Sequence, residues 1–232
     1  MFYIDQTSKA FQDAKNEHYQ FIRYVIKKKL LGKHFKEPHP KKLDQKIYQV
    51  KGIHSKVAAF LNDEVNLKSV LVGTPDVLDK LKHRFKTKKA QDSIRKLINY
   101  DAFTDTKSDK TFRFYHGYDL AEKLDIQTCI YCNRLYTHTI ITDKRDFIAR
   151  ATFDHWFPKG TYPLLALSFY NLIPSCNVCN SSIKGSDIYA LKNIFHPYYK
   201  HKSTSKRLDF SFSYDLEDHI KATSLLEPKN KF

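Results

Sequence analysis

The chain of 232 residues contains no apolar run that approaches the roughly 20 residues needed to cross a bilayer as a helix. Its N-terminus has no basic stretch followed by an apolar core, so no signal peptide is expected. Internal repeats and low-complexity segments are also absent. These absences predict a globular cytoplasmic protein without a membrane partner.

Acidic residues are scarce relative to basic ones, with 25 Asp and Glu against 40 Lys and Arg and a formal net charge of +15. A charge of this size repels itself in the compact state, and the usual compensation is a polyanionic partner such as nucleic acid or an acidic membrane surface. The hydrophobic content of 41% and the aromatic content of 14% are typical of a packed protein, and the rings also suit stacking on bases. We therefore expect a nucleic-acid partner.

Cysteine is rare, and its four occurrences form two C-x2-C pairs, Cys129 with Cys132 and Cys176 with Cys179. Clustered cysteines in a reducing compartment favour metal binding over a disulfide, and two such pairs can close a tetrahedral Zn²⁺ site. Four thiolates leave no open position on the ion, so this zinc would be structural. The alternatives are free buried cysteines or a redox pair, although a redox pair needs a βαβ setting that the sequence does not indicate.

The first hundred residues or so have helical patterns. Apolar residues three and four apart predict one long helix over residues 8–31, capped by Thr7 or Ser8 and ended by Gly32. The prolines in 33–46 indicate a loop. Further helices are expected over 54–62, from Thr74-Pro75 to about 85, and over 89–100.

Two strongly basic runs, 23–42 and 80–96, lie within this helical part, and each holds eight Lys or Arg residues. They are solvated helix faces or surfaces that contact phosphates. Contact with nucleic acid would not depend on its sequence, because nothing resembles a recognition helix.

The composition changes after residue 117, where cysteines, histidines, prolines and asparagines become frequent. The segment 101–118 contains polar turn residues followed by a short aromatic stretch that resembles a strand, and strict alternation over 208–214 predicts a strand near the C-terminus. The predicted organisation is a basic helical region that binds nucleic acid or a partner (1–117), a zinc-containing module (118–200) and a tail (201–232).

Three segments stand in a fixed order around the cysteines: Phe153-Asp154-His155-Trp156-Phe157-Pro158-Lys159, then Tyr170-Asn171-Leu172, then Cys179-Asn180-Ser181-Ser182-Ile183-Lys184-Gly185. This order resembles the zinc-containing branch of the HNH endonucleases over about residues 120–200. More narrowly, it is similar to the HNH subunits that accompany ATPases in bacterial anti-phage systems of the Septu and retron kind. The resemblance implies an α+β chain in which a small ββα-metal, treble-clef-like nuclease domain follows the helical region.

The resemblance also implies a division of roles among five residues. Asp154 would hold a divalent metal, and His155 would be the general base, since the pKa of an imidazole lies near the working pH. Asn180 stands where the name-giving motif has its last histidine, and its amide oxygen would be the second metal ligand. Asn171 would brace the loop and orient the His155 ring, and Lys184 would hold a phosphate. A carboxylate with an amide oxygen suits Mg²⁺ or Mn²⁺.

Each of these residues has an ordinary alternative. An Asp-His pair is commonly a surface feature or a satisfied hydrogen-bond pair, and Asn171 alone would be a turn residue, Asn180 a helix cap and Lys184 a helix end. The joint pattern favours a metal-dependent endonuclease acting on nucleic acid, with double-stranded DNA as the expected substrate and anti-phage defence as the expected role. One rival is a zinc-stabilised module that binds nucleic acid or protein without catalysis. Another is an effector that stays silent until a partner ATPase or a non-coding RNA releases it.

The residues around this pattern carry smaller expectations. Arg134, just after the first cysteine pair, could touch a phosphate. Trp156 and Phe157 are expected to fill the core behind the strand, and His196 is expected to be structural.

Overall fold

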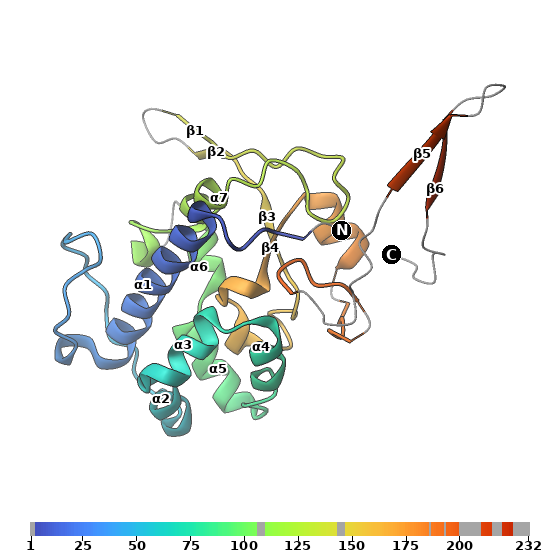
Figure 1. Cartoon of the computed structure of the whole chain (residues 1–232). Coiled ribbons are helices and arrows are strands. Elements are labelled where there is room, and N and C mark those ends of the chain that lie inside the picture. The colour runs from blue at the N-terminus through green and yellow to red at the C-terminus, as the bar shows by residue number, and fades with distance from the viewer. Residues whose placement is uncertain are drawn as a thin grey trace. The chain divides into compact units, whose positions relative to one another are not determined.

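The computed structural model describes residues 3–105, 110–142, 147–185, 187–192, 194–199, 210–214 and 220–224. Over these residues the chain is α+β, with seven α-helices and three two-stranded antiparallel sheets (Figure 1). It divides into two compact units, Met1–Tyr199 and Lys200–Phe232. The expected α+β class is therefore confirmed.

The α-helices all lie in the first unit. They are α1 (Lys9–Leu31), α2 (Ser55–Asn62), α3 (Glu64–Val72), α4 (Pro75–Leu81), α5 (Lys88–Leu97), α6 (Tyr100–Thr104) and α7 (Gly117–Leu124). The 3-10 turns of the described residues are η1 (Gly32–His34), η2 (Lys110–Phe112), η3 (Pro163–Leu165) and η4 (Phe169–Asn171).

The strands of the first unit are short. They are β1 (Ile140–Ile141), β2 (Phe147–Ala149), β3 (Thr152–His155) and β4 (Leu172–Ser175), and a π-helix, η5 (Val178–Lys184), follows β4. β1 pairs with β2 and β3 pairs with β4, both antiparallel. The segment from β3 to η5 thus has the order strand, strand, helix.

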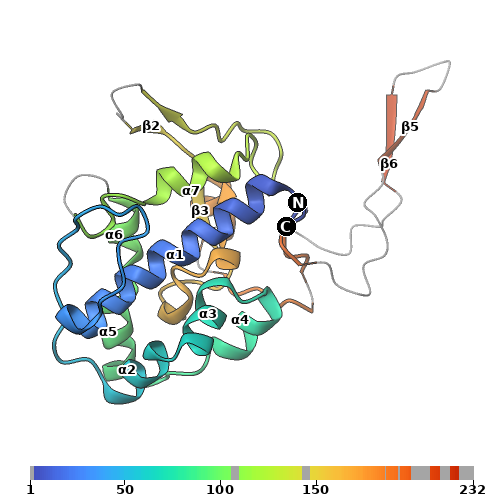
Figure 2. The same ribbon diagram turned by 60° about the vertical axis from the view of Figure 1, so that its left-hand side comes forward.

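The long helix α1 confirms the prediction for residues 8–31. The Ser8 hydroxyl accepts a hydrogen bond from the Phe11 amide at 3.2 Å, and Gly32 ends the helix with a φ of +55°. Its apolar stripe is buried, and α1 packs against α7 and α3 (Figure 2).

Three details of the helical part differ from expectation. Helix α4 ends at Leu81 and not near 85, and the Phe85 ring packs edge-on against Phe60 of α2, with ring centroids 5.4 Å apart. Helices α3 and α7 were not expected. Instead of a strand, the aromatic stretch after residue 110 forms η2 and a turn, because Phe112 and Tyr115 are buried against other rings of the core.

One hydrophobic core runs through the helical part and the cysteine-containing part. Polar contacts join them as well. His18 of α1 donates from Nε2 to the Leu167 carbonyl at 2.8 Å, and the Ser168 hydroxyl donates to the Val70 carbonyl of α3. Residues 1–199 pack as a single unit. The predicted boundary near residue 117 is therefore not a boundary between compact units, and it stays a prediction about function.

The second unit contains the antiparallel hairpin of β5 (Phe210–Tyr214) and β6 (Ile220–Ser224), in which Phe210 pairs with Ser224. The strand predicted over 208–214 is confirmed for 210–214, and residues 208 and 209 lie outside the described ranges.

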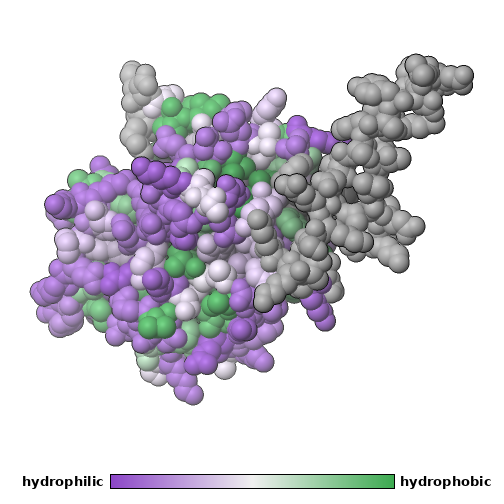
Figure 3. Space-filling view, viewed as in Figure 1, coloured by the Kyte–Doolittle hydropathy of each residue, from purple (hydrophilic) through white to green (hydrophobic). Residues whose placement is uncertain are grey.

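The face of the described residues that Figure 3 shows is mainly polar. Hydrophilic side chains cover most of the face seen in Figure 3, and the apolar ones form small separate spots. None of the helices described is long and apolar enough to cross a membrane.

Candidate functional site

The four cysteines lie close together in space, although the pair Cys129 and Cys132 is far in the sequence from the pair Cys176 and Cys179. Their Sγ atoms all lie within 4.8 Å of one another, and no disulfide joins them. A tetrahedral Zn²⁺ with Zn–S bonds of about 2.3 Å needs sulfurs about 3.8 Å apart, which this cluster can satisfy with small adjustments. The predicted four-cysteine cluster is therefore confirmed as a group that could hold a metal ion, and its chemistry is compatible with zinc.

Backbone hydrogen bonds shape the two turns that carry the thiols. In the first turn the Cys129 amide donates to the Leu135 carbonyl at 2.9 Å, and Asn133 adopts a φ of +51° to close the loop. In the second turn the Cys179 amide donates to the Cys176 sulfur at 3.4 Å. The Ile130 amide donates to the carbonyl of Pro174 in β4, just before the second turn, and this bond connects the two turns.

The thiol environments differ from one another. Burial raises the pKa of Cys129 and of Cys179. Burial also acts on Cys132, but hydrogen bonds from the Arg134 and Leu135 amides outweigh it and lower the pKa of Cys132 to about 7. A bound divalent cation stabilises the thiolate form, so it favours deprotonation of the whole cluster.

Asp154 and His155 are the last two residues of β3. They pair with Ile173 and Leu172 of β4 and are nearly buried, with exposed fractions of 2% and 8%. Because successive residues of a strand point to opposite faces, the two side chains meet different neighbours.

The Asp154 carboxylate is held from both sides. The Tyr131 hydroxyl donates a hydrogen bond to Oδ2, and the Lys184 ammonium lies 3.1 Å from Oδ1. Burial raises the pKa of Asp154, and the charge of Lys184 and the bond from Tyr131 oppose that shift. The carboxylate thus already carries one positive partner inside the protein.

Lys184 does not point into solvent. It is 4% exposed, and in addition to its ion pair with Asp154 it donates to the His155 carbonyl at 2.8 Å. The structure therefore joins Lys184 directly to the two residues of β3, whereas the sequence suggested that it reaches for a phosphate.

The His155 ring is oriented by two neighbours. Its Nε2 atom lies 2.9 Å from the Ala166 carbonyl, which can only accept, so the neutral ring carries its proton there and presents the lone pair of Nδ1. The Tyr100 ring of α6 packs edge-on at 4.4 Å between centroids. Burial lowers the pKa of His155 to about 4, which keeps the ring neutral at pH 7.

Asn171 is fully buried and braces the loop that follows β3. Its Oδ1 accepts from the Phe157 amide at 2.7 Å, and its Nδ2 donates to the carbonyls of Phe157 and Leu165 at 3.1 and 2.9 Å. Leu165 precedes Ala166, whose carbonyl holds the His155 ring. Asn171 is thus placed to orient His155 indirectly.

Asn180 lies on η5, which packs against β3. Its half-buried side chain makes no hydrogen bond within the described part of the chain. The Gly185 amide donates to the Asn180 carbonyl at 3.0 Å, an i to i+5 bond that places Asn180 and Lys184 about one π-turn apart. The amide oxygen of Asn180 is therefore available as a ligand.

Two tyrosines contact the candidate site residues, although little in the sequence indicated these contacts. Tyr131 lies between the first two cysteines, a position that suggested no contact with Asp154. Tyr100 belongs to the helical part, and only tertiary packing brings it to His155. Arg134 is exposed and has no ion pair among the residues described.

The comparisons with known proteins are negative. No family model, no curated protein and no solved structure matches this chain.

The aromatic residues behind β3 have structural roles, as expected. Trp156 and Phe157 are fully buried. His196 packs against the Trp156 ring at 4.4 Å between centroids and accepts from the Tyr198 amide at 3.1 Å. Burial lowers the pKa of His196 to about 3.

Proposed function

We propose that the chain is a metal-dependent endonuclease of the HNH type that hydrolyses phosphodiester bonds of nucleic acid, with double-stranded DNA as the first substrate to test. The observation that carries the proposal is the direct contact between the end of β3 and η5, where Lys184 bonds both Asp154 and the His155 carbonyl. These are the elements and residues that the motif singled out, and they lie beside a cluster able to hold zinc.

His155 has the protonation state that a general base requires, although its pKa of about 4 lies below the working pH from which the role was expected. Its ring is neutral at pH 7, and the bond from Nε2 to the Ala166 carbonyl leaves Nδ1 to accept a proton. In the proposed reaction His155 takes a proton from a water molecule as its oxygen attacks phosphorus. The bond from phosphorus to the 3′ oxygen breaks, and that oxygen takes up a proton from solvent, which leaves 5′-phosphate and 3′-hydroxyl ends.

The donors at the site fit a hard divalent cation. Asp154 supplies a buried carboxylate, whose Oδ1 would have to exchange the Lys184 ammonium for the ion, and Asn180 supplies an amide oxygen without a hydrogen-bond partner among the described residues. When bound, Mg²⁺ or Mn²⁺ would supply positive charge to stabilise the negative charge that develops on the phosphate oxygens. Tyr131 fixes the other carboxylate oxygen and so limits the orientations of Asp154.

Burial of the site favours the alternative in which the enzyme is inactive until an activator exposes these residues. Asp154 and Lys184 are 2% and 4% exposed, so a phosphate must displace neighbouring groups before it reaches them. A partner ATPase or a non-coding RNA, as in the anti-phage systems that the motif resembles, would be the activator.

The proposal is tested by incubating supercoiled plasmid with the purified zinc-loaded chain and Mg²⁺ or Mn²⁺, in parallel with His155→Ala. We expect nicking by the wild-type chain and a loss of about 100-fold or more in the variant, because general-base catalysis typically contributes that much. Nicking at equal rates would refute the assignment of His155.

An inactive wild-type chain leads to the second arm of the same experiment. Co-expression with the product of a neighbouring gene should restore cleavage by the wild-type chain and not by His155→Ala. If neither condition produces cleavage while the chain still binds nucleic acid, the rival of a binding module without catalysis is correct.

A further inference from the structure

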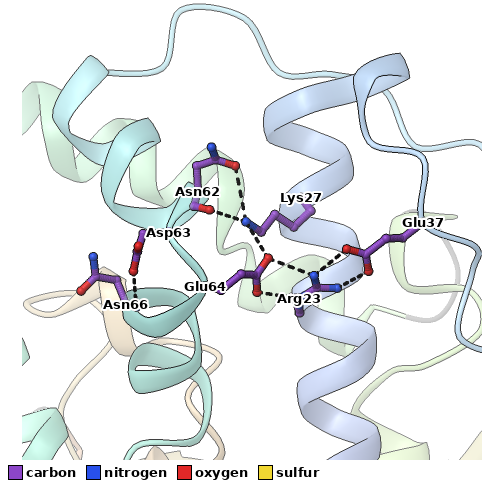
Figure 4. A network of polar contacts seen from close by, with 7 residues as sticks. All are labelled: Arg23, Lys27, Glu37, Asn62, Asp63, Glu64 and Asn66. Atoms are coloured by element: carbon purple, nitrogen blue, oxygen red, sulfur yellow. Dashed lines mark hydrogen bonds and ion pairs between the residues drawn. The ribbon is translucent and has the colours of Figure 1, made fainter.

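The charged side chains of the two basic runs, 23–42 and 80–96, have different surroundings in the structure. In the run 23–42, the Arg23 guanidinium is paired with two carboxylates of the chain: it makes two hydrogen bonds to Glu37, at 2.5 and 2.7 Å, and bonds Glu64 at 2.8 Å (Figure 4). Lys27 joins the same network through Glu64 at 2.9 Å and the Asn62 carbonyl. These cations hold α1 to α3 and to the loop after η1.

Other lysines of the first run are occupied in the same way. Lys28 donates to the Phe35 carbonyl at 3.0 Å, and Lys29 to the Lys96 carbonyl at 3.3 Å. Lys41 donates to the Phe114 carbonyl at 3.1 Å. Five of the eight cationic side chains in this run therefore make contacts within the chain, and those of Arg23, Lys27 and Lys41 include a carboxylate. The run is a weaker candidate for binding phosphate than an exposed group of cations without carboxylate partners.

The second run, 80–96, borders a groove instead. The groove has a volume of about 710 Å³ and lies between α2, α3, the loop after α4 and the start of α5. Its wall includes His54, Lys56, Arg84 and Lys86, with Phe60 and Phe85 between them, and contains no carboxylate. Lys56, Arg84 and Lys86 form no ion pair with any residue that the structure describes.

The chemistry of the groove matches a phosphate backbone. The Arg84 guanidinium lies over the Phe60 ring at 5.3 Å, which holds it in place without neutralising it. Thr87, the N-cap residue of α5, and Ala90 line the groove, so the positive end of that helix lies at this wall, and its first turn holds no acidic residue. A second hollow, of about 480 Å³, differs in that Glu37 and Glu64 in its wall neutralise Arg23.

We infer that this groove, lined by His54, Lys56, Arg84 and Lys86, binds the sugar-phosphate backbone of the nucleic acid on which the candidate site acts. The inference rests on the proposed function for the choice of ligand. Helix α5 connects the two places, because Arg95 near its C-terminal end donates to the Gly160 carbonyl at 3.0 Å, five residues beyond His155. With a rise of 1.5 Å per residue, α5 is about 15 Å long, the length of about four base pairs of a duplex.

The test measures binding without cleavage. A fluorescent 20-base-pair duplex is titrated with the full-length zinc-loaded chain carrying His155→Ala, in buffer without Mg²⁺ or Mn²⁺, and anisotropy is recorded at several salt concentrations. The groove variant adds Arg84→Ala and Lys86→Ala. The matched control adds Lys33→Ala and Lys36→Ala, which removes the same charge from two exposed lysines of the first run.

We expect the groove variant to bind about tenfold more weakly and the slope of log Kd against log salt to fall by about 2, because two phosphate contacts are lost. The control should change the Kd by less than about twofold. Equal weakening in both variants, or none in the groove variant, overturns the inference. Plasmid nicking is scored separately with the wild-type chain, alone and after co-expression with the neighbouring gene product. If neither condition gives cleavage but the groove variant still loses binding, the proposed function is refuted and the groove is retained.

Discussion

At the scale of single residues, the two asparagines of the motif have opposite environments. Asn171 is fully buried and makes three hydrogen bonds to the backbone of the loop after β3. Asn180 is half-buried and makes no side-chain hydrogen bond among the residues described. The first residue therefore belongs to the scaffold, and the second is available to a ligand.

We predict that Asn171→Ala lowers the free energy of unfolding by about 2–4 kcal/mol, because it leaves the Phe157 amide and two carbonyls buried without their partner. For a chain of this size the Tm should fall by roughly 5–10 °C. Thermal unfolding followed by circular dichroism measures the change.

Asn180→Ala is the matched control, since it removes the same side chain from a site without those bonds. It should shift stability by less than about 0.5 kcal/mol and abolish metal-dependent nicking. Equal destabilisation by the two substitutions would contradict the separate roles given to them.

At the scale of elements, a side-chain hydrogen bond connects the first cysteine turn to the strand β3. Tyr131 stands between Cys129 and Cys132, and its hydroxyl bonds Asp154. The second turn leads directly into η5, which carries Asn180 and Lys184. An ion that holds the two turns therefore also fixes the groups proposed for catalysis.

We predict that chelation of the metal with a zinc-selective chelator lowers the Tm and abolishes nicking, even when Mg²⁺ is supplied in excess. The loss follows because four thiols without an ion no longer hold the two turns, and Tyr131 then loses its fixed position on Asp154. Unfolding temperature and nicking are measured before chelation, after it, and after Zn²⁺ is restored.

Restored Zn²⁺ should recover both properties in the wild-type chain and neither in Cys129→Ser. Nicking that survives complete removal of the ion would show that the thiol cluster does not support the site.

At the scale of the whole molecule, three buried histidines that are distant in the sequence share one behaviour. Burial lowers the pKa of His18 to about 4, of His155 to about 4 and of His196 to about 3. Their ordinary pKa is 6.5, so on unfolding below that pH each ring takes up a proton that the folded chain does not bind.

We predict that stability is fully retained above pH 6.5 and falls as the pH drops from 6.5 towards 4. Each histidine contributes about 1.4 kcal/mol per pH unit in that window, and the three together contribute about 4 kcal/mol per unit. Urea unfolding at pH 7, 6 and 5 measures the slope. His18→Gln should reduce the slope by about a third, and a free energy of unfolding that stays constant between pH 7 and 5 would refute the prediction.

The sequence predicted the local features of this fold well and its distant contacts poorly. The spacing of apolar residues located α1, and the paired cysteines predicted a cluster that the structure assembles. The aromatic stretch after residue 110 was wrongly predicted as a strand, because its aromatic character cannot show that Phe112 and Tyr115 pack into a helical core. The contacts of Lys184 and Tyr131 with Asp154 also could not be predicted, since each joins residues at least 23 positions apart.

The sequence alone determined the excess of positive charge, the four thiols in two turns and the order of Asp154, His155, Asn171 and Asn180, because these depend on residue type and spacing. The tertiary structure decided which of those charges are free. It pairs Arg23 with two carboxylates, buries Lys184 against Asp154 and leaves Arg84 and Lys86 at an open groove. The physical reason is that an ionic group is neutralised by its neighbours in space, and the folded core, not the order of residues, determines those neighbours.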